Sequence, residues 1–157
     1  MGNIFNNDFR DFIKALNEAK VEYILVGGYA VIFHGFKRTT GDMDIWVNKT
    51  KQNYKKIEHA FKLFGMPVFD MDLKKFISKH TESEVFRFGI SPSRIDLMTK
   101  VKGLDFNEAF ESAIWFTDDD LNTRVIHYNT LIKAKKASKR SKDYVDIEEL
   151  EKIKNAR

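Results

Sequence analysis

The sequence predicts an α/β (α+β) fold in which a mixed, partly antiparallel sheet is flanked by helices. Short runs of β-prone apolar residues alternate along the chain with longer segments whose apolar residues recur at helical spacing. With 157 residues, 43% of them hydrophobic, the chain has the usual size of one globular domain with its own core. We therefore expect a single domain over residues 1–157, with about four to six strands and with helices at its C-terminal end.

The first half of the chain predicts helix, strand, glycine turn, helix, strand and helix. Apolar residues three and four positions apart indicate the helices; Asn7 is the expected N-cap of the first, and Gly65 is expected to end the last. The strands are short β-prone runs, one of which stops at Gly27 and Gly28. The expected elements are a helix over 9–16, a strand over 23–26, a helical turn or two over 29–34, a strand over 42–47 and a helix over 54–64.

The second half is less regular. Two β-prone runs are separated by a link over 89–94 that contains Pro92, which predicts a hairpin. Asp105 is placed to cap a helix, and residues 66–83 are ambiguous apart from a short helix around 73–77. The expected elements are strands over 85–88 and 95–99, a helix over 105–110, a last short strand over 125–128, and helices over 130–138 and 143–155.

The composition limits the chemistry that the chain can carry. The sequence has no cysteine, so disulfides and thiolate metal sites are excluded, and any metal must be held by oxygen or imidazole ligands. Apolar stretches are far shorter than the roughly 20 residues that span a bilayer, and the N-terminus lacks a signal-peptide pattern. We expect a cytoplasmic protein with no membrane partner. The formal charge of +4 fits a phosphate-bearing ligand as well as an ordinary surface.

Two aspartates lie two positions apart in a predicted strand. Side chains alternate between the faces of a strand, so Asp42 and Asp44 project to one side while the apolar residue between them points into the core. Like charges held this close are costly unless a cation lies between them, which leaves a metal site, a proton-sharing pair or a solvated strand end. Asp96, in a second predicted strand, is a third carboxylate that can join the same face. Three such groups match what one or two Mg²⁺ (or Mn²⁺) ions require.

Gly27 and Gly28 follow a predicted strand and precede a predicted helix. Because they have no side chains, their backbone N–H groups can approach a phosphate, and the N-terminus of the helix adds favourable partial charge. A tight turn is the alternative interpretation of the same pair.

The order and spacing of these motifs resemble the signature of the DNA polymerase β-type nucleotidyltransferase superfamily. A Val-Gly-Gly run at 26–28 is followed after thirteen residues by Asp-Met-Asp-Ile at 42–45, and later by Ile-Asp-Leu at 95–97. The resemblance extends to small bacterial nucleotidyltransferase-like proteins, including toxin and antitoxin components and abortive-infection enzymes. In these proteins a strand-Gly-Gly-helix unit precedes an Arg-x-Thr-x-Asp-x-Asp stretch, which here is residues 38–44. The segment 133–146 also resembles their helical ending.

The resemblance implies a nucleotidyltransferase fold and the transfer of a nucleoside monophosphate from an NTP to an acceptor hydroxyl, with Mg²⁺ or Mn²⁺ as cofactor and pyrophosphate as product. By this resemblance Asp42 and Asp44 ligate the metal, and Asp96 completes the site and takes the proton of the attacking hydroxyl. Gly27 and Gly28 contact the β- and γ-phosphates. The acceptor stays open among RNA 3′ ends, a hydroxyl side chain of a partner protein and a small hydroxyl compound such as an antibiotic.

Several basic residues have two interpretations each. Arg38 is expected either to clamp a phosphate or the acceptor, or to form a surface ion pair beside the acidic strand. Lys136, Arg140 and Lys142, in a basic run near the C-terminus, are expected either to touch the nucleotide or an RNA acceptor, or to solvate a helix face. We expect the C-terminal helices to close one side of a cleft whose edge carries the acidic cluster.

Two further functions fit the same residues. One is a weakly active or inactive protein of this fold that acts through protein partners, as in a toxin–antitoxin pair; the intact set of three aspartates argues against it. The other is a metal-dependent phosphoesterase, although a Gly-Gly element ahead of the aspartates suits a triphosphate better than a diester. The sequence leaves the oligomeric state open.

Overall fold

A computed structural model of the chain describes residues 4–81 and 84–157. Six strands form one mixed sheet in it: β1 (Tyr23–Val26), β2 (Met43–Val47), β3 (Val85–Phe88), β4 (Ile95–Met98), β5 (Ile114–Asp118) and β6 (Leu121–Val125). Their order across the sheet is β3-β4-β2-β1-β6-β5. β1 pairs antiparallel with β2 and parallel with β6, while β2 pairs parallel with β4. The predicted α/β class with a mixed sheet is therefore confirmed.

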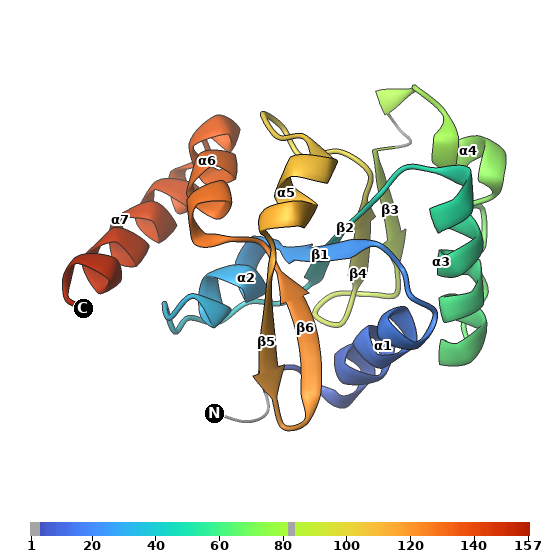
Figure 1. Cartoon of the computed structure of the whole chain (residues 1–157), viewed down its shortest axis with the longest axis horizontal. Coiled ribbons are helices and arrows are strands. Elements are labelled where there is room, and N and C mark those ends of the chain that lie inside the picture. The colour runs from blue at the N-terminus through green and yellow to red at the C-terminus, as the bar shows by residue number, and fades with distance from the viewer. Residues whose placement is uncertain (1–3, 82–83) are drawn as a thin grey trace.

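Helices pack on the sheet and also lie beyond it at both ends of the molecule. The described residues form α1 (Asn7–Glu18), α2 (Gly27–Phe33), α3 (Lys51–Phe64), α4 (Leu73–Ile77), α5 (Phe106–Ser112), α6 (Tyr128–Ser138) and α7 (Ser141–Asn155). α3 and α4 lie at one end of the molecule, and α6 and α7 lie together at the other (Figure 1). No helix in the described part of the chain combines the length and the apolar character that a bilayer crossing requires.

One face of the sheet packs on α1 and α3. Met43 and Ile45 of β2 are fully buried on this face. The ring of Phe61 in α3 lies 4.7 Å from that of Phe88 in β3 and 5.5 Å from that of Phe12 in α1. Because side chains alternate along β2, this core directs the residue between Met43 and Ile45 to the opposite face.

Most of the local predictions are confirmed. Gly65 ends α3 in the left-handed conformation at φ 84°, and the Asp105 side chain accepts a hydrogen bond from the Glu108 N–H to cap α5. The hairpin of β3 and β4 and the short helix over 73–77 are also present. Of the ambiguous segment 66–83, residues 82–83 lie outside the described residues.

Several element boundaries differ from the prediction by a few residues, and three of the differences are the following. The N-cap of α1 is Asn6 instead of Asn7, because the Asn6 side chain accepts from the Phe9 N–H. β2 begins at Met43, whose N–H donates to the Arg94 carbonyl, so Asp42 lies just before the strand. The strand expected over 125–128 is wrong, since β6 ends at Val125 and α6 begins at Tyr128.

The β5–β6 hairpin was not predicted at all. Its turn residues, Asp119 and Asp120, both have positive φ, 48° and 66°. Two positive φ values in a two-residue loop are the geometry of a type I′ turn, in which Asn-Gly or Asp-Gly is the usual signal. Asp-Asp tolerates this conformation less readily, so the sequence carries a weak signal for the turn.

Candidate functional site

A cleft of about 490 Å³ opens where β1 ends and β2 and β4 begin, beside α6 and α7. Its walls carry six cationic side chains and three carboxylates. The excess of positive charge suits an anionic ligand, and the clustered carboxylates suit a cation. The charged residues that line it are Arg38, Asp42, Asp44, Arg87, Arg94, Asp96, Lys135, Arg140 and Lys142.

The sheet register places the three aspartates together. Asp44 and Asp96 are direct partners in the parallel pair of β2 and β4, so their side chains leave the same face of adjacent strands. This is the face opposite the core of α1 and α3. Asp42, immediately before β2, lines the same cleft. All three carboxylates therefore lie at one end of the sheet.

The electrostatics of Asp44 reflect this crowding. Burial, followed by the negative charge of Asp96, raises the pKa of Asp44 to about 6, and Asp42 adds to the rise. Lys142 and Arg140, on the helical side of the cleft, act in the opposite direction without cancelling it. The ionised Asp44 is thus short of positive charge, which is the condition of a carboxylate that gains from binding a cation.

Arg94 lies between the other two aspartates. Its Nε donates to Asp96 Oδ1 at 2.8 Å, and its Nη2 donates to Asp96 Oδ2 at 3.1 Å and lies 3.2 Å from Asp42 Oδ2. Asp42 also accepts from the Arg94 backbone N–H at 3.2 Å and from Ser91 Oγ at 2.9 Å. The loop between β3 and β4 therefore holds Asp42 through its backbone and a hydroxyl, and places one guanidinium group on two carboxylates.

These residues match a divalent metal by their chemistry, while their present arrangement is that of an ion pair. Carboxylate oxygens are the ligands that Mg²⁺ and Mn²⁺ prefer. Asp42 and Asp96 already converge on one cationic group, the guanidinium of Arg94. Within residues 4–81 and 84–157, no three Asp, Glu, His or Cys side chains form a ready metal-binding group. The three carboxylates are therefore suitable ligands for a metal. In this structure the guanidinium of Arg94 supplies the positive charge beside Asp42 and Asp96.

The two glycines are required by close approaches in the cleft floor. Gly27 has φ +68°, and a Cβ on it would overlap the carboxylate of Asp44. A Cβ on Gly28 would overlap the Thr40 hydroxyl and lie 3.3 Å from Arg38 Nη2. Gly28 and the start of α2 thus touch the Arg38–Asp44 segment directly. The N-cap of α2 is Val26, whose side chain has no hydrogen-bond acceptor for the amides of the first turn.

A buried charge network forms the helical wall of the cleft. Lys135, with only 6% of its side chain exposed, lies 3.0 Å from the carboxylates of both Asp143 and Asp146. Arg38 pairs with Asp146 at 2.9 Å, and Arg140 pairs with Asp143 at 2.9 Å. The network ties the segment after α2 to α6 and α7. Arg38 thus forms an ion pair, which was one of the two roles expected for it. Its partner, Asp146, belongs to the C-terminal helix α7 and not to the acidic strand.

The pKa of Asp143 shows that this network is well compensated. Burial alone would raise the pKa of Asp143, but hydrogen bonds from Ser138, Arg140 and Lys135 outweigh burial and hold the pKa at about 2. Asp143 is therefore ionised and fully partnered. Its role is to fix the basic side chains that face the cleft.

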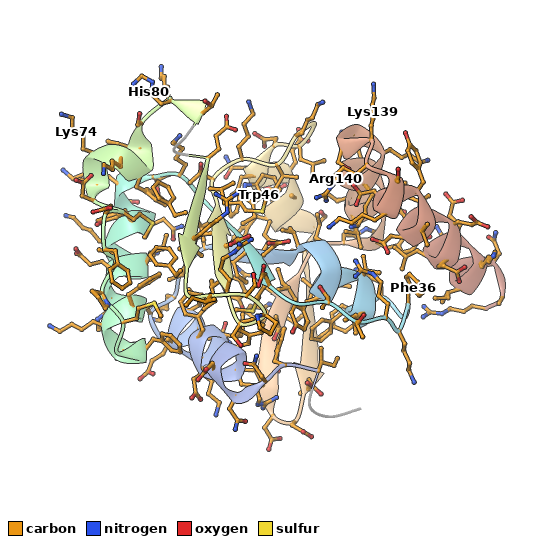
Figure 2. All side chains as sticks on the ribbon, turned by 180° about the vertical axis from the view of Figure 1, so that it is seen from behind. Phe36, Trp46, Lys74, His80, Lys139 and Arg140 are labelled. Atoms are coloured by element: carbon orange, nitrogen blue, oxygen red, sulfur yellow. The ribbon has the colours of Figure 1, made fainter. Side chains whose placement is uncertain are left out.

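The structure brings together all but one of the residues singled out in the sequence. Asp42, Asp44, Asp96, Gly27, Gly28, Arg38 and Arg140 all line the cleft. Lys136 is exposed on α6 and does not belong to the lining, so its place is that of a solvated helix residue. Figure 2 shows Arg140 on the side of α6 and α7 that faces the sheet, whereas Lys139 points away from the body of the protein.

Sequence reasoning missed Lys135 and Arg94, although each had a signal. Lys135 lies four positions after the buried Leu131, so helical spacing places both on the inner side of α6. Arg94 lies two positions before Asp96, so strand alternation places both on one face.

A smaller, more apolar pocket of about 260 Å³ adjoins the cleft. Both spaces are lined by Gly27, Asp44, Met98, Lys135 and Arg140. Its other walls combine aliphatic side chains with polar ones: Val26, Val101, Ile126, Leu131 and Ala134 beside Lys100, Lys102, Ser138 and Asp143. A ligand that spans the two would have a charged part beside the aspartates and a less polar part against the aliphatic side chains.

Neither the protein-family models nor the curated proteins compared with the chain match it. The residues and contacts of the cleft are therefore what indicate its chemistry.

Proposed function

We propose that the chain is a metal-dependent nucleotidyltransferase, which moves a nucleoside monophosphate from an NTP to an acceptor hydroxyl and releases pyrophosphate. One observation carries the proposal. Asp44 and Asp96 are in register on adjacent strands, with Asp42 beside them, in the same cleft as Gly27 and Gly28. Carboxylates, glycine backbone and basic side chains in one cleft suit a metal and a triphosphate together.

The acidic residues have a defined part in this reaction. Asp42, Asp44 and Asp96 would hold Mg²⁺ or Mn²⁺, and a bound metal supplies the positive charge that offsets charge developing on the phosphates. Asp96 would also take the proton of the attacking hydroxyl. This assignment of the proton to Asp96 comes from the family resemblance.

The glycines and the basic side chains of the cleft would bind the triphosphate. Gly27 and Gly28 begin α2 and lie against the Arg38–Asp44 segment, and their backbone amides would donate to phosphate oxygens. Arg140 reaches the cleft with 61% of its side chain exposed, so its guanidinium is accessible to an incoming phosphate. The buried Lys135 adds positive charge behind it.

The adjoining apolar pocket suits the nucleoside. It shares Gly27 and Asp44 with the cleft, so a base in this pocket leaves the α-phosphate near the aspartates. Apolar walls with a few polar groups are typical of small-molecule sites. The acceptor then approaches from the open side of the cleft, and RNA, a protein hydroxyl and a small hydroxyl compound all remain candidates.

The test is transfer of label from each α-labelled NTP in Mg²⁺ or Mn²⁺, with total RNA, cell protein and aminoglycosides offered as separate acceptors. We expect labelled product in one acceptor class, and loss of it in Asp44→Asn. Lys136→Ala, which changes an exposed residue outside the cleft, is the matched control and should keep its activity. No labelled product with any NTP, or undiminished labelling by Asp44→Asn, would overturn the proposal and favour a protein that acts through partners.

A further inference from the structure

Arg94 is the one basic residue of the cleft that contacts two of the three aspartates directly, as far as the described residues show. We propose that Arg94 is the resident counter-ion of the site and competes with the divalent metal for Asp42 and Asp96, so that it makes metal binding depend on the nucleotide. This role rests on the proposed function, because it concerns the metal of that same reaction.

The competition follows from the atoms involved. Both oxygens of Asp96 accept from the guanidinium, at 2.8 and 3.1 Å, and Asp42 Oδ2 lies 3.2 Å from Nη2. A metal bound by these oxygens would lie next to the positively charged guanidinium of Arg94, and the repulsion between the two cations would be strongly unfavourable. The metal and the guanidinium are therefore alternative partners of the two carboxylates.

The Arg94 side chain can move away from the two carboxylates without disturbing the rest of the site. Its side chain is 32% exposed, so the guanidinium has solvent beside it. Asp42 remains oriented by the Arg94 backbone N–H and by Ser91 Oγ, neither of which depends on the guanidinium. The carboxylate is thus held in place for a second cation.

A nucleotide changes the balance between the two cations. Its phosphates supply oxygen ligands to the metal and, in the same cleft, new anionic partners for the displaced guanidinium. Metal alone offers Arg94 no such partner. Metal and nucleotide therefore bind with positive coupling, and the coupling is reciprocal.

The experiment measures the affinity of the protein for Mn²⁺ by electron paramagnetic resonance, once without nucleotide and once with an α,β-methylene NTP, which cannot be cleaved at the α-phosphate. Arg94→Gln removes the guanidinium. Arg87→Gln is the matched control, because Arg87 lines the same cleft opposite Asp96 in the β3–β4 pair and its loss changes the net charge equally. We expect Arg94→Gln to bind Mn²⁺ at least about tenfold more tightly than Arg87→Gln in the absence of nucleotide. The coupling to nucleotide should fall by a similar factor.

Arg94→Lys, which keeps the charge but loses the planar fork, should show a smaller gain. Circular dichroism verifies that each variant is folded. Equal Mn²⁺ affinities in Arg94→Gln and Arg87→Gln would overturn the role of Arg94, as would wild-type protein that binds Mn²⁺ equally tightly with and without the nucleotide. If Arg94→Gln gains Mn²⁺ affinity while the wild-type protein transfers no label, the competition stands and the proposed nucleotidyl transfer falls.

Discussion

Replacing Asp44 with asparagine should stabilise the protein while abolishing the proposed nucleotidyl transfer. The pKa of Asp44 rises from 3.8 to about 6 on folding, chiefly through burial and then through the charge of Asp96. A pKa difference of one between the folded and unfolded states corresponds to ~1.4 kcal/mol, so this rise corresponds to about 3 kcal/mol of destabilisation when Asp44 is ionised in the folded protein. Asparagine has nearly the same shape and carries no charge, so Asp44→Asn recovers up to this amount at neutral pH.

The sign of the pH dependence follows from the direction of the shift. A raised pKa means that the folded state holds the proton more tightly, so stability falls as pH rises from about 4 to above 6 and then levels off. The gain from Asp44→Asn should therefore be about 0.5 kcal/mol near pH 4 and close to 3 kcal/mol near pH 7.5. Burial lowers the pKa of His34, which makes acid unfavourable for folding, but this contribution is common to both proteins and cancels in the difference.

Urea denaturation of metal-free protein at both pH values measures the two differences. Asp42→Asn is the control, because Asp42 is partnered by Ser91 and Arg94, so its loss should cost about 1 kcal/mol at neutral pH instead of adding stability. Equal unfolding free energies of Asp44→Asn and wild type at neutral pH would refute the cost of burying a charged Asp44 beside Asp96. A gain of the same size at both pH values would refute the electrostatic explanation.

The remaining predictions separate neighbouring residues and competing roles. Lys135→Ala should lower the unfolding free energy by about 3–5 kcal/mol because it leaves two buried carboxylates short of a partner, whereas Lys136→Ala should change it by less than ~0.5 kcal/mol in the same melts. Gly28→Val, whose side chain would overlap the Thr40 hydroxyl, should weaken NTP binding at least about tenfold in equilibrium titrations; unchanged affinity would leave Gly28 as a tight turn only. If RNA is the acceptor, Arg140→Ala should reduce the slope of log affinity against log salt by roughly 0.7 to 0.9, and an unchanged slope would favour a protein or small-molecule acceptor.

The acidic end of the site was predictable because it depends on short-range regularities. Alternation predicts one side for Asp42 and Asp44, although β2 itself begins only at Met43, and an apolar residue on each side of Asp96 marks a second buried strand. The glycine pair before them is likewise local. These patterns predict the candidate residues, whereas the parallel pairing of β2 with β4, which sets Asp96 beside Asp44, joins segments distant in the sequence.

The basic end was not predictable from the same kind of pattern. The Arg38–Asp146 pair joins residues 108 positions apart, and no local rule brings them together. Within the C-terminal run the lysines look alike in sequence, although Lys135 is buried and Lys136 is exposed. The choice between them depends on which side of α6 faces the sheet, and this is decided by tertiary packing.

The two groups of aspartates differ in how far the protein's own cations partner them. Hydrogen bonds from three residues hold the pKa of Asp143 at about 2, so the protein itself supplies all the positive charge that this carboxylate requires. The pKa of Asp44 lies at about 6 because burial and Asp96 are only partly offset by Lys142 and Arg140. A carboxylate of the first kind stabilises the fold, whereas one of the second kind costs stability until a cation arrives from outside. Binding of a metal with its nucleotide should therefore stabilise the wild-type protein more than Asp44→Asn, since only the wild type has this deficit to relieve.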